Sequence, residues 1–273
     1  MILLMENNII QQLAHLRTKC PLVQNISNFV VMNNTANALL AIGASPIMSH
    51  AKEEMPEMLQ LVNSLVINIG TLDVEWAKAM IFAANCANEL QKPWVLDPVG
   101  AGISKLRNET LKQLLDLHPT VIRGNASEIM ALHSFETATV KGVDSTESSS
   151  TAIDAAKSLN KTFGSIVCIS GEIDYIVSDN EIIEINNGSP LMTKVTGLGC
   201  SSTALIGAFL GLGLNPFEEA AAGVAVLSLA GELAALKSNG PGSLQMNLYD
   251  QLYQMDTATL EDKLKIKRYA YSS

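Results

Sequence analysis

Short apolar runs alternate with longer helical patterns through most of this chain, and this alternation restricts the possible folds more than any other feature. Residues 62–69, 93–96, 120–122 and 165–169 have the length and apolar character of buried strands. Helical patterns fall between and around them, at residues 73–90, 106–117 and 152–163 and in the segment after Gly124. Strands that alternate with helices predict an α/β fold, in which helices cover both faces of a parallel sheet.

The pattern changes in the second half of the chain. Residues 175–178 and 181–185 flank Asp179-Asn180, a pair that suits a tight hairpin turn. The sheet is therefore expected to end in antiparallel strands. After Gly199 the sequence is predicted to be nearly all helix to its end, and residues 29–42 predict another helix near its start.

Composition narrows the possible functions. The chain has 273 residues, of which 48% are hydrophobic and 16% charged, with no low-complexity linker or internal repeat. We therefore expect a single domain over residues 1–273.

The net charge of −9 argues against a nucleic-acid partner, because phosphate backbones attract basic surfaces. No C-x-x-C pair or metal-ligand spacing of histidines occurs, which argues against disulfide staples and a zinc site.

Two apolar regions of the sequence could be an export signal or a membrane span. The first ten residues, MILLMENNII, have no basic start and no small-residue cleavage site, so a secretory signal is not expected. The apolar stretch 203–236 is interrupted by Pro216, Glu218, Glu219 and Glu232. Acidic pairs are costly in lipid, so this stretch predicts buried core helices without a membrane partner. The expected location is the cytoplasm.

A glycine-rich turn gives the strongest functional signal. The sequence VTGLGCSSTA, from Val195 to Ala204, leads from glycines directly into an apolar helix. Glycines permit a close backbone approach, and the free N–H groups and dipole of a helix N-terminus attract anions. Such a turn suits a transferring phosphoryl group. The alternative is that Gly197 and Gly199 merely cap a core helix.

Three strand ends add polar side chains. Asp97 ends an apolar strand in VLDPVGAG and could hold Mg²⁺, or it could simply begin a turn before Pro98. Arg123 ends the next strand, where it could reach phosphate oxygens. Glu128 follows Asn125 at the spacing of a helix capping box, so it is either a cap, a metal ligand or both. Ser170 precedes a glycine and is either a phosphate contact or a turn residue.

Together these segments supply an anion hole, carboxylates, a cation and a hydroxyl, which are the parts that phosphoryl transfer needs. We therefore predict a kinase that phosphorylates a small alcohol. The sequence contains no G-x-x-x-x-G-K-[ST] loop and no protein-kinase motif set, which excludes those two classes.

The motifs, in their order and spacing, resemble those of ribokinase-like kinases, and more closely those of the hydroxyethylthiazole kinases of thiamine salvage. The resemblance runs from about Pro21 to the last helices and includes the strings PLVQNISNFVVMNNTANALLAIGASPIMS, VLDPVGAG, IRGNASEI and VTGLGCSSTALIGAF. It implies a three-layer αβα fold with a mostly parallel central sheet. It also implies ATP as co-substrate, Mg²⁺, a thiazole alcohol as acceptor, and a homotrimer with sites between subunits.

The resemblance assigns roles residue by residue. Cys200 stands where most ribokinase-like enzymes have an aspartate base, and this cysteine matches the thiazole kinase pattern. The implied ATP contacts are Arg123, Ser170, Asp97 and Thr196, the implied Mg²⁺ ligands are Asp97 and Glu128, and the implied substrate contacts are Met48 and the Gly197 backbone. Two positions depart from the family pattern, Leu198 and Ser170, where threonine is usual.

Several alternatives remain open at this point. A lone methionine such as Met48 more often fills a core. Asn25 and Asn28 could line the same pocket or cap the helix expected over residues 29–42. Another small alcohol could be the acceptor, or the chain could be an ATP-dependent dehydratase. Cys200 at a helix N-terminus could instead be a thiolate nucleophile. The helix N-terminus should lower the pKa of its thiol, whereas a nearby γ-phosphate should raise it, so the sequence does not predict the net direction. A non-catalytic nucleotide-binding module is the remaining alternative.

Overall fold

The structure is a computed structural model that describes residues 2–137 and 149–271, with side chains described for residues 9–135 and 151–271. Within these ranges a nine-stranded sheet runs in the order β2-β1-β3-β4-β5-β6-β7-β8-β9. The first six strands are parallel, and β7, β8 and β9 each run antiparallel to the preceding strand in this order. Their bounds are β1 Leu22–Ile26, β2 Ser45–Ile47, β3 Ser64–Asn68, β4 Trp94–Asp97, β5 Val121–Asn125, β6 Ile166–Ser170, β7 Asp174–Val177, β8 Glu181–Ile185 and β9 Ile266–Ala270.

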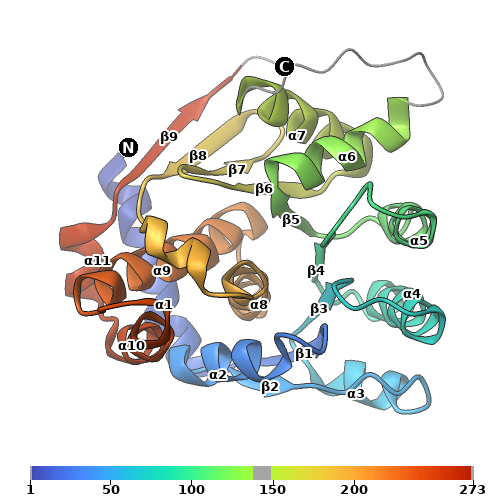
Figure 1. Ribbon diagram of the computed structural model, residues 1–273, viewed down its shortest axis with the longest axis horizontal. Coiled ribbons are helices and arrows are strands. Elements are labelled where there is room, and N and C mark those ends of the chain that lie inside the picture. Colours follow the sequence, from blue (N-terminus) through green and yellow to red (C-terminus); the bar gives the residue numbers. More distant parts are fainter. Residues whose placement is uncertain (1, 138–148, 272–273) are drawn as a thin grey trace.

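Helices cover both faces of the sheet, which gives three layers (Figure 1). One face carries α3 Met55–Leu61, α4 Val74–Glu89, α5 Lys105–Leu115, α6 Ala126–Thr137 and α7 Ser149–Phe163. The other carries α1 Ile2–Lys19, α2 Met32–Ile42, α8 Leu198–Leu210, α9 Pro216–Leu236, α10 Pro241–Gln254 and α11 Thr257–Lys263. A 3₁₀ helix, η1 Pro190–Lys194, leads into α8.

Strand side chains divide the core into two parts. In β3, Val66 packs with the α8 and α9 side, whereas Leu65 and Ile67 pack with the α3 and α4 side. This division follows from the two-residue period of a strand, which turns successive side chains to opposite faces. Both faces are apolar, which explains why the parallel strands appear as continuous hydrophobic runs in the sequence.

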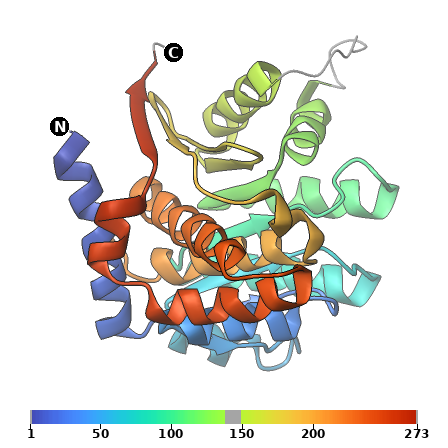
Figure 2. The ribbon, with the colours of Figure 1, turned by 60° about the vertical axis from the view of Figure 1, so that its left-hand side comes forward.

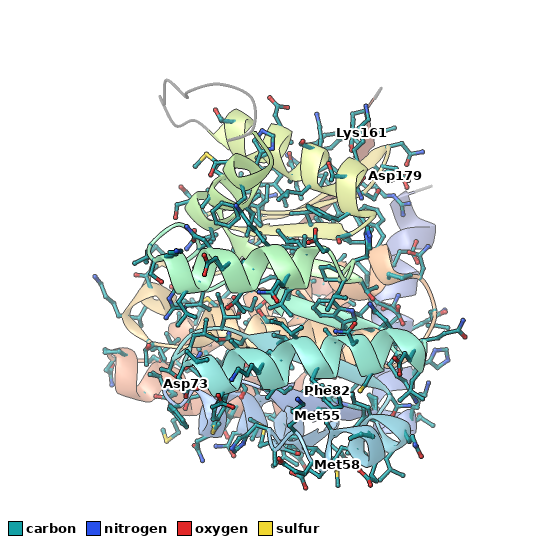
Figure 3. The ribbon with its side chains drawn as sticks, turned by 90° about the vertical axis from the view of Figure 1, so that its right-hand side faces the viewer. Met55, Met58, Asp73, Phe82, Lys161 and Asp179 are labelled. Atoms are coloured by element: carbon teal, nitrogen blue, oxygen red, sulfur yellow. The ribbon has the colours of Figure 1, made fainter. Side chains whose placement is uncertain are left out.

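Figure 3 looks onto the face that α4 covers. Asp73 lies at the start of α4 and accepts a hydrogen bond from the backbone N–H of Trp76 at 2.8 Å, which caps the helix. Phe82, further along α4, points toward α3, which carries Met55 and Met58. The Lys52 ammonium group lies 5.0 Å from the centre of the Phe82 ring. The helices α3 and α4 thus pack side by side on this face of the sheet.

The predicted α/β class, the mostly parallel sheet and the antiparallel end of the sheet are confirmed. The expected hairpin joins β7 to β8, where the Ser178 N–H donates to the Glu181 carbonyl at 3.0 Å. Two predictions are wrong in detail. The expected all-helical end contains β9, which lies beside α1 and α11 (Figure 2). The helix expected from Phe29 begins at Met32, because the residues before it form a turn in which the Val31 N–H donates to the Asn28 carbonyl at 3.2 Å.

The long apolar helix α9 meets the length and composition of a membrane span, but 78% of its most apolar window is buried inside the protein. It packs against α8, α10 and α1. Its N-terminal Asn215 caps the backbone N–H groups of Phe217 and Glu218. The helix is therefore a core helix of the α/β fold.

Candidate active site

Polar side chains gather where the parallel strands end. Asn68 and Asp97 close β3 and β4, and Asn28 follows β1. The carboxyl ends of parallel strands lie at one edge of a sheet, where ligands bind in open α/β folds. The N-terminus of α8 enters the same edge, because Thr203 in its second turn donates to Asp97.

A continuous hydrogen-bond network links these segments. Asn28 Nδ2 donates to Asn68 Oδ1 at 2.7 Å, and Asn68 Nδ2 donates to Asp97 Oδ2 at 2.7 Å. Thr203 Oγ1 donates to the same Asp97 oxygen at 2.8 Å. Gly70 N–H also donates to Asn68 Oδ1, at 3.0 Å. Because Asn68 accepts twice at its oxygen and donates at its nitrogen to a carboxylate, the orientation of its amide is fixed.

Asp97 is a buried carboxyl group, only 1% exposed. Burial raises its pKa to about 6, opposed by the Arg123 charge and by the hydrogen bonds from Thr203 and Asn68. The group is therefore ionised at neutral pH but protonated in mild acid. Within the described ranges no hydrogen bond to its second oxygen, Oδ1, is present, which leaves that atom able to accept a further ligand.

Two glycines shape the N-terminus of α8. Gly197 is its N-cap with φ +81°, and a Cβ there would lie 2.4 Å from Val31 Cγ1. A Cβ on Gly199 would lie 2.6 Å from Arg123 Nη1. Gly199 therefore allows the guanidinium to lie against the first turn of α8. The Arg123 side chain makes no hydrogen bond or ion pair to the parts of the chain that the structure describes, so its donors are available to an anion at the helix N-terminus.

Cys200 lies in this first turn beside the network. Its Sγ is 3.7 Å from Asn28 Nδ2. A helix N-terminus by itself lowers the pKa of a thiol, but the surroundings of Cys200 act in the opposite direction. Burial, followed by the negative charge of Asp97, raises the pKa of the Cys200 thiol to about 12. The group is thus an uncharged thiol at neutral pH, which argues against the thiolate nucleophile considered above.

Glu128 has the capping role that its spacing suggested. Its Oε2 accepts from the Asn125 N–H at 2.9 Å, and Asn125 Oδ1 accepts from the Glu128 N–H at 2.9 Å. These reciprocal bonds form a capping box at the start of α6. The other oxygen, Oε1, accepts from the Gly100 N–H at 3.0 Å, so Glu128 also fixes the glycine turn that follows Asp97.

A cavity of about 700 Å³ opens beside Arg123. Ser170 and Gly171 line it at the end of β6, and η1, the start of α8 and the middle of α9 complete its wall. Asp174 holds the Ser170 turn in place, because its carboxylate accepts from the Gly171 N–H at 3.1 Å and from Ser228 Oγ at 2.8 Å. Burial raises the pKa of Asp174. The cavity therefore combines one cation, that of Arg123, with several hydroxyls and the carboxylates of Glu172 and Asp174. Its apolar wall consists of Ile169, Met192, Leu198, Val224 and Leu227.

Met48 and Thr196, which the sequence also predicted for the site, are not among the described residues that line this cavity. Met48 is half-buried just beyond β2, and the next residue, Ser49, accepts from Gln24 Nε2 of β1 at 3.3 Å. Thr196 is exposed before α8, and its carbonyl accepts from Asn34 Nδ2 at 3.5 Å. Gly197 lies against Val31 in the segment that joins β1 to α2. His50, two residues after Met48, stacks on Trp76, whose ring also contacts Phe29 of that segment.

Sequence reasoning missed three members of the network. The position of Asn28 in the sequence is consistent with either a pocket residue or a helix cap, and in the structure α2 begins at Met32 without a side-chain cap. Asn68 ends an apolar strand, as Asp97 does, and this shared position was the available signal. Thr203 lies one helical turn after Gly199 inside an apolar helix, and nothing local distinguishes it from a core threonine.

Comparisons with known proteins place this geometry in context. The model of the hydroxyethylthiazole kinase family matches residues 13–258. A hydroxyethylthiazole kinase of Syntrophus aciditrophicus is 52% identical over 92% of this chain and 93% of its own length. That of Vibrio parahaemolyticus is 53% identical over 95% of this chain and 97% of its own length.

Solved structures agree with the sequence comparisons. The hydroxyethylthiazole kinase protein of Pyrococcus horikoshii superposes with a TM-score of 0.90 at 38% identity, over 96% of this chain and 99% of that chain. A Staphylococcus aureus pyridoxal kinase in complex with ADP has a TM-score of 0.65 at 14% identity, over 91% of this chain and 99% of that chain. At that identity the second likeness concerns the fold alone, and it confirms the ribokinase-like architecture.

Proposed function

Because this chain belongs to the hydroxyethylthiazole kinase family, we propose that it transfers the γ-phosphoryl group of ATP to the hydroxyl of 4-methyl-5-(2-hydroxyethyl)thiazole. The observation that carries the proposal is the Arg123 guanidinium held against Gly199 at the N-terminus of α8, beside the buried Asp97. This arrangement concentrates positive potential where phosphoryl charge develops during transfer.

ATP is assigned to the cavity beside Arg123. Its volume of about 700 Å³ suits a nucleotide, and its apolar wall suits a base. Arg123 and the Ser170 hydroxyl would then contact phosphate oxygens. Thr196 is kept as an ATP contact because it directly precedes the glycine cap of α8 on the exposed side. Asp97, which lies within electrostatic reach of Arg123, completes the phosphate side.

The residues present fit a magnesium ion. Asp97 supplies a carboxylate oxygen without a described hydrogen-bond donor, and Glu128 supplies a second carboxylate on the adjacent turn. No group of three His, Cys, Asp or Glu gathers among the described residues. Mg²⁺ commonly uses one or two carboxylates, with water and substrate phosphates completing its shell. Bound there, the ion would neutralise phosphate charge.

The thiazole alcohol is assigned to the side of the α8 N-terminus that lies away from the cavity proposed for ATP. Met48, Asn28 and Gly197 border that side, and Cys200 lies between it and Asp97. A loose transition state leaves the alcohol proton in place until late, so no strong base is needed. As a neutral thiol, Cys200 would orient the alcohol oxygen and contribute a modest factor, whereas Asn28 would hold the thiol in position.

Three broader proposals accompany this assignment. We infer a single domain over residues 1–273, since the two core clusters share one sheet. We infer a homotrimer with shared substrate sites. Phe29, Val30 and Val74 are exposed apolar side chains near the proposed thiazole site, and exposed apolar patches often mark protein–protein contacts. We infer a cytoplasmic location, supported by the use of ATP and by four free cysteines. Light scattering, with activity followed across protein concentration, tests the trimer.

A panel of alcohols tests the function. Purified protein with MgATP should release ADP fastest with hydroxyethylthiazole, and mass spectrometry should identify the thiazole phosphate. Pyridoxal and a hydroxymethylpyrimidine serve as competitors of related shape. Faster phosphorylation of either competitor would overturn the substrate assignment, and the absence of ADP release with all three would overturn the kinase assignment.

A further inference from the structure

Arg107 binds three backbone carbonyls at the edge of the sheet that carries the site. It lies in the first turn of α5 and is part-buried. Its Nη1 donates to the Ile69 carbonyl at 2.5 Å and to the Val99 carbonyl at 2.7 Å, and its Nη2 donates to the Gly70 carbonyl. One side chain therefore joins the turn after β3 to the turn after β4.

Both turns carry groups of the proposed reaction centre. Ile69 and Gly70 directly follow Asn68, and the Gly70 N–H donates to the Asn68 side chain. Val99 lies two residues after Asp97, and the next N–H, that of Gly100, is held by Glu128. The guanidinium thus fixes the separation between the turns whose side chains meet in the 2.7 Å bond from Asn68 to Asp97.

We propose that Arg107 is a positioning residue for phosphoryl transfer, which sets the distance between Asn68 and Asp97 by clamping the turns that carry them. The planar fork of a guanidinium can serve three carbonyls at once, whereas the ammonium of lysine is a compact point charge on a flexible stem. The inference rests on the proposed kinase reaction. Arg107 itself touches neither substrate.

The chain offers a matched control. Arg17 also donates to three backbone carbonyls, those of Ile42 at 3.4 Å and of Leu252 and Tyr253 at 3.0 Å each. Ile42 ends α2 and precedes β2, so this clamp lies at the amino ends of the strands, away from the site. Loss of either guanidinium leaves backbone carbonyls, most of them part-buried, without this donor and should destabilise the fold, but only loss of Arg107 should disturb the site.

The test compares Arg107→Ala, Arg107→Lys, Arg17→Ala and Arg17→Lys for kcat, KM and thermal unfolding. A misplacement of about 1 Å can cost roughly 10²-fold in rate, so Arg107→Ala is expected to lose about that much in kcat. Its KM for ATP should change by less, because Arg123 and Ser170 remain. Both Arg17 variants should unfold at lower temperature with kcat unchanged.

Chemical rescue separates positioning from general stability. Guanidinium ion at concentrations too low to denature the protein should restore part of the kcat of Arg107→Ala, because it can occupy the vacated space. It should not rescue Arg107→Lys, where the lysine fills that space. Wild-type turnover in the same assay tests the kinase reaction separately.

Three results would overturn the proposal. The first is a folded Arg107→Ala with wild-type kcat, and the second is an equal loss of kcat in the Arg17 and Arg107 variants. The third is an absence of rescue in a folded Arg107→Ala. If that variant does not fold, Arg107→Lys decides: a folded lysine variant with wild-type kcat refutes the clamp, and one with reduced kcat supports it.

Discussion

Thr203→Val should destabilise the protein much more at pH 8 than at pH 5. Thr203 is fully buried, and its hydroxyl donates to Asp97 Oδ2 at 2.8 Å, while the Gly199 carbonyl lies 3.3 Å away as a second acceptor. Valine has nearly the same shape but cannot donate. The variant therefore removes one of the two described donors that hold the buried carboxylate.

The pKa of Asp97 sets the pH dependence. Burial raises it to about 6, above the usual value of about 3.9 for an aspartate in an unfolded chain. The contribution of this group to stability is therefore fully present below pH 4 and is lost as the pH rises through 6. Without the Thr203 hydrogen bond the ionised form is less favoured, so the pKa rises further and the loss at high pH becomes larger.

The magnitude follows from the charge of the acceptor. A hydrogen bond to a charged group is worth about 1.5–3 kcal/mol, and one between neutral groups about 0.5–1.5 kcal/mol. At pH 8 the variant loses the first, because Asp97 is ionised. At pH 5 it loses the second. The difference between the two destabilisations should therefore be about 1 kcal/mol or more.

Urea unfolding at both pH values, in a chelator so that no metal contributes, measures this difference. Thr203→Ser is the matched control, because it retains the hydroxyl and loses a methyl group, at a cost that does not depend on pH. Equal destabilisation of Thr203→Val at the two pH values, or a larger one at pH 5, would refute the reasoning that this hydroxyl stabilises an ionised Asp97.

Three other perturbations probe the site and its support. Cys200→Ala should lower kcat by about 10²-fold or less and leave measurable activity. Cys200→Asp should stay active at neutral pH. As the pH is lowered, its activity should fall at a higher pH than that of the wild type, because two neighbouring carboxylates raise each other's pKa. A substrate adduct trapped on Cys200, with both variants inactive, would contradict this. Gly199→Ala should raise the KM for ATP about tenfold, since its Cβ displaces Arg123, and an unchanged KM would remove Arg123 from the phosphate site. Glu219→Gln should stabilise the protein at pH 8 relative to pH 5, because burial raises the pKa of Glu219 to about 7 and its stabilising contribution is lost as the pH rises through that value; parallel pH profiles of variant and wild type would contradict it.

The sequence by itself determined the architecture. Apolar runs of strand length between helical patterns predicted the parallel strands and their flanking helices, and Asp179-Asn180 predicted the hairpin. These features are local, since backbone propensity and side-chain period act within a few residues. The strand β9 was not predicted because residues 266–270 contain two adjacent charged residues and no apolar run, and among the described strands they pair only with β8 at the sheet edge. Nothing local distinguishes such a strand from a loop.

The sequence also determined several of the candidate site residues, because glycines, a strand-end aspartate and an arginine occur in recognisable order. Tertiary structure decided how they work together. It joined Asn28, Asn68, Asp97 and Thr203 into one network across four segments, and it decided the direction in which the pKa of Cys200 moves, which burial and Asp97 raise. A pKa depends on burial and on neighbouring charges brought from elsewhere in the chain, and neither can be read from the residues on either side of a cysteine.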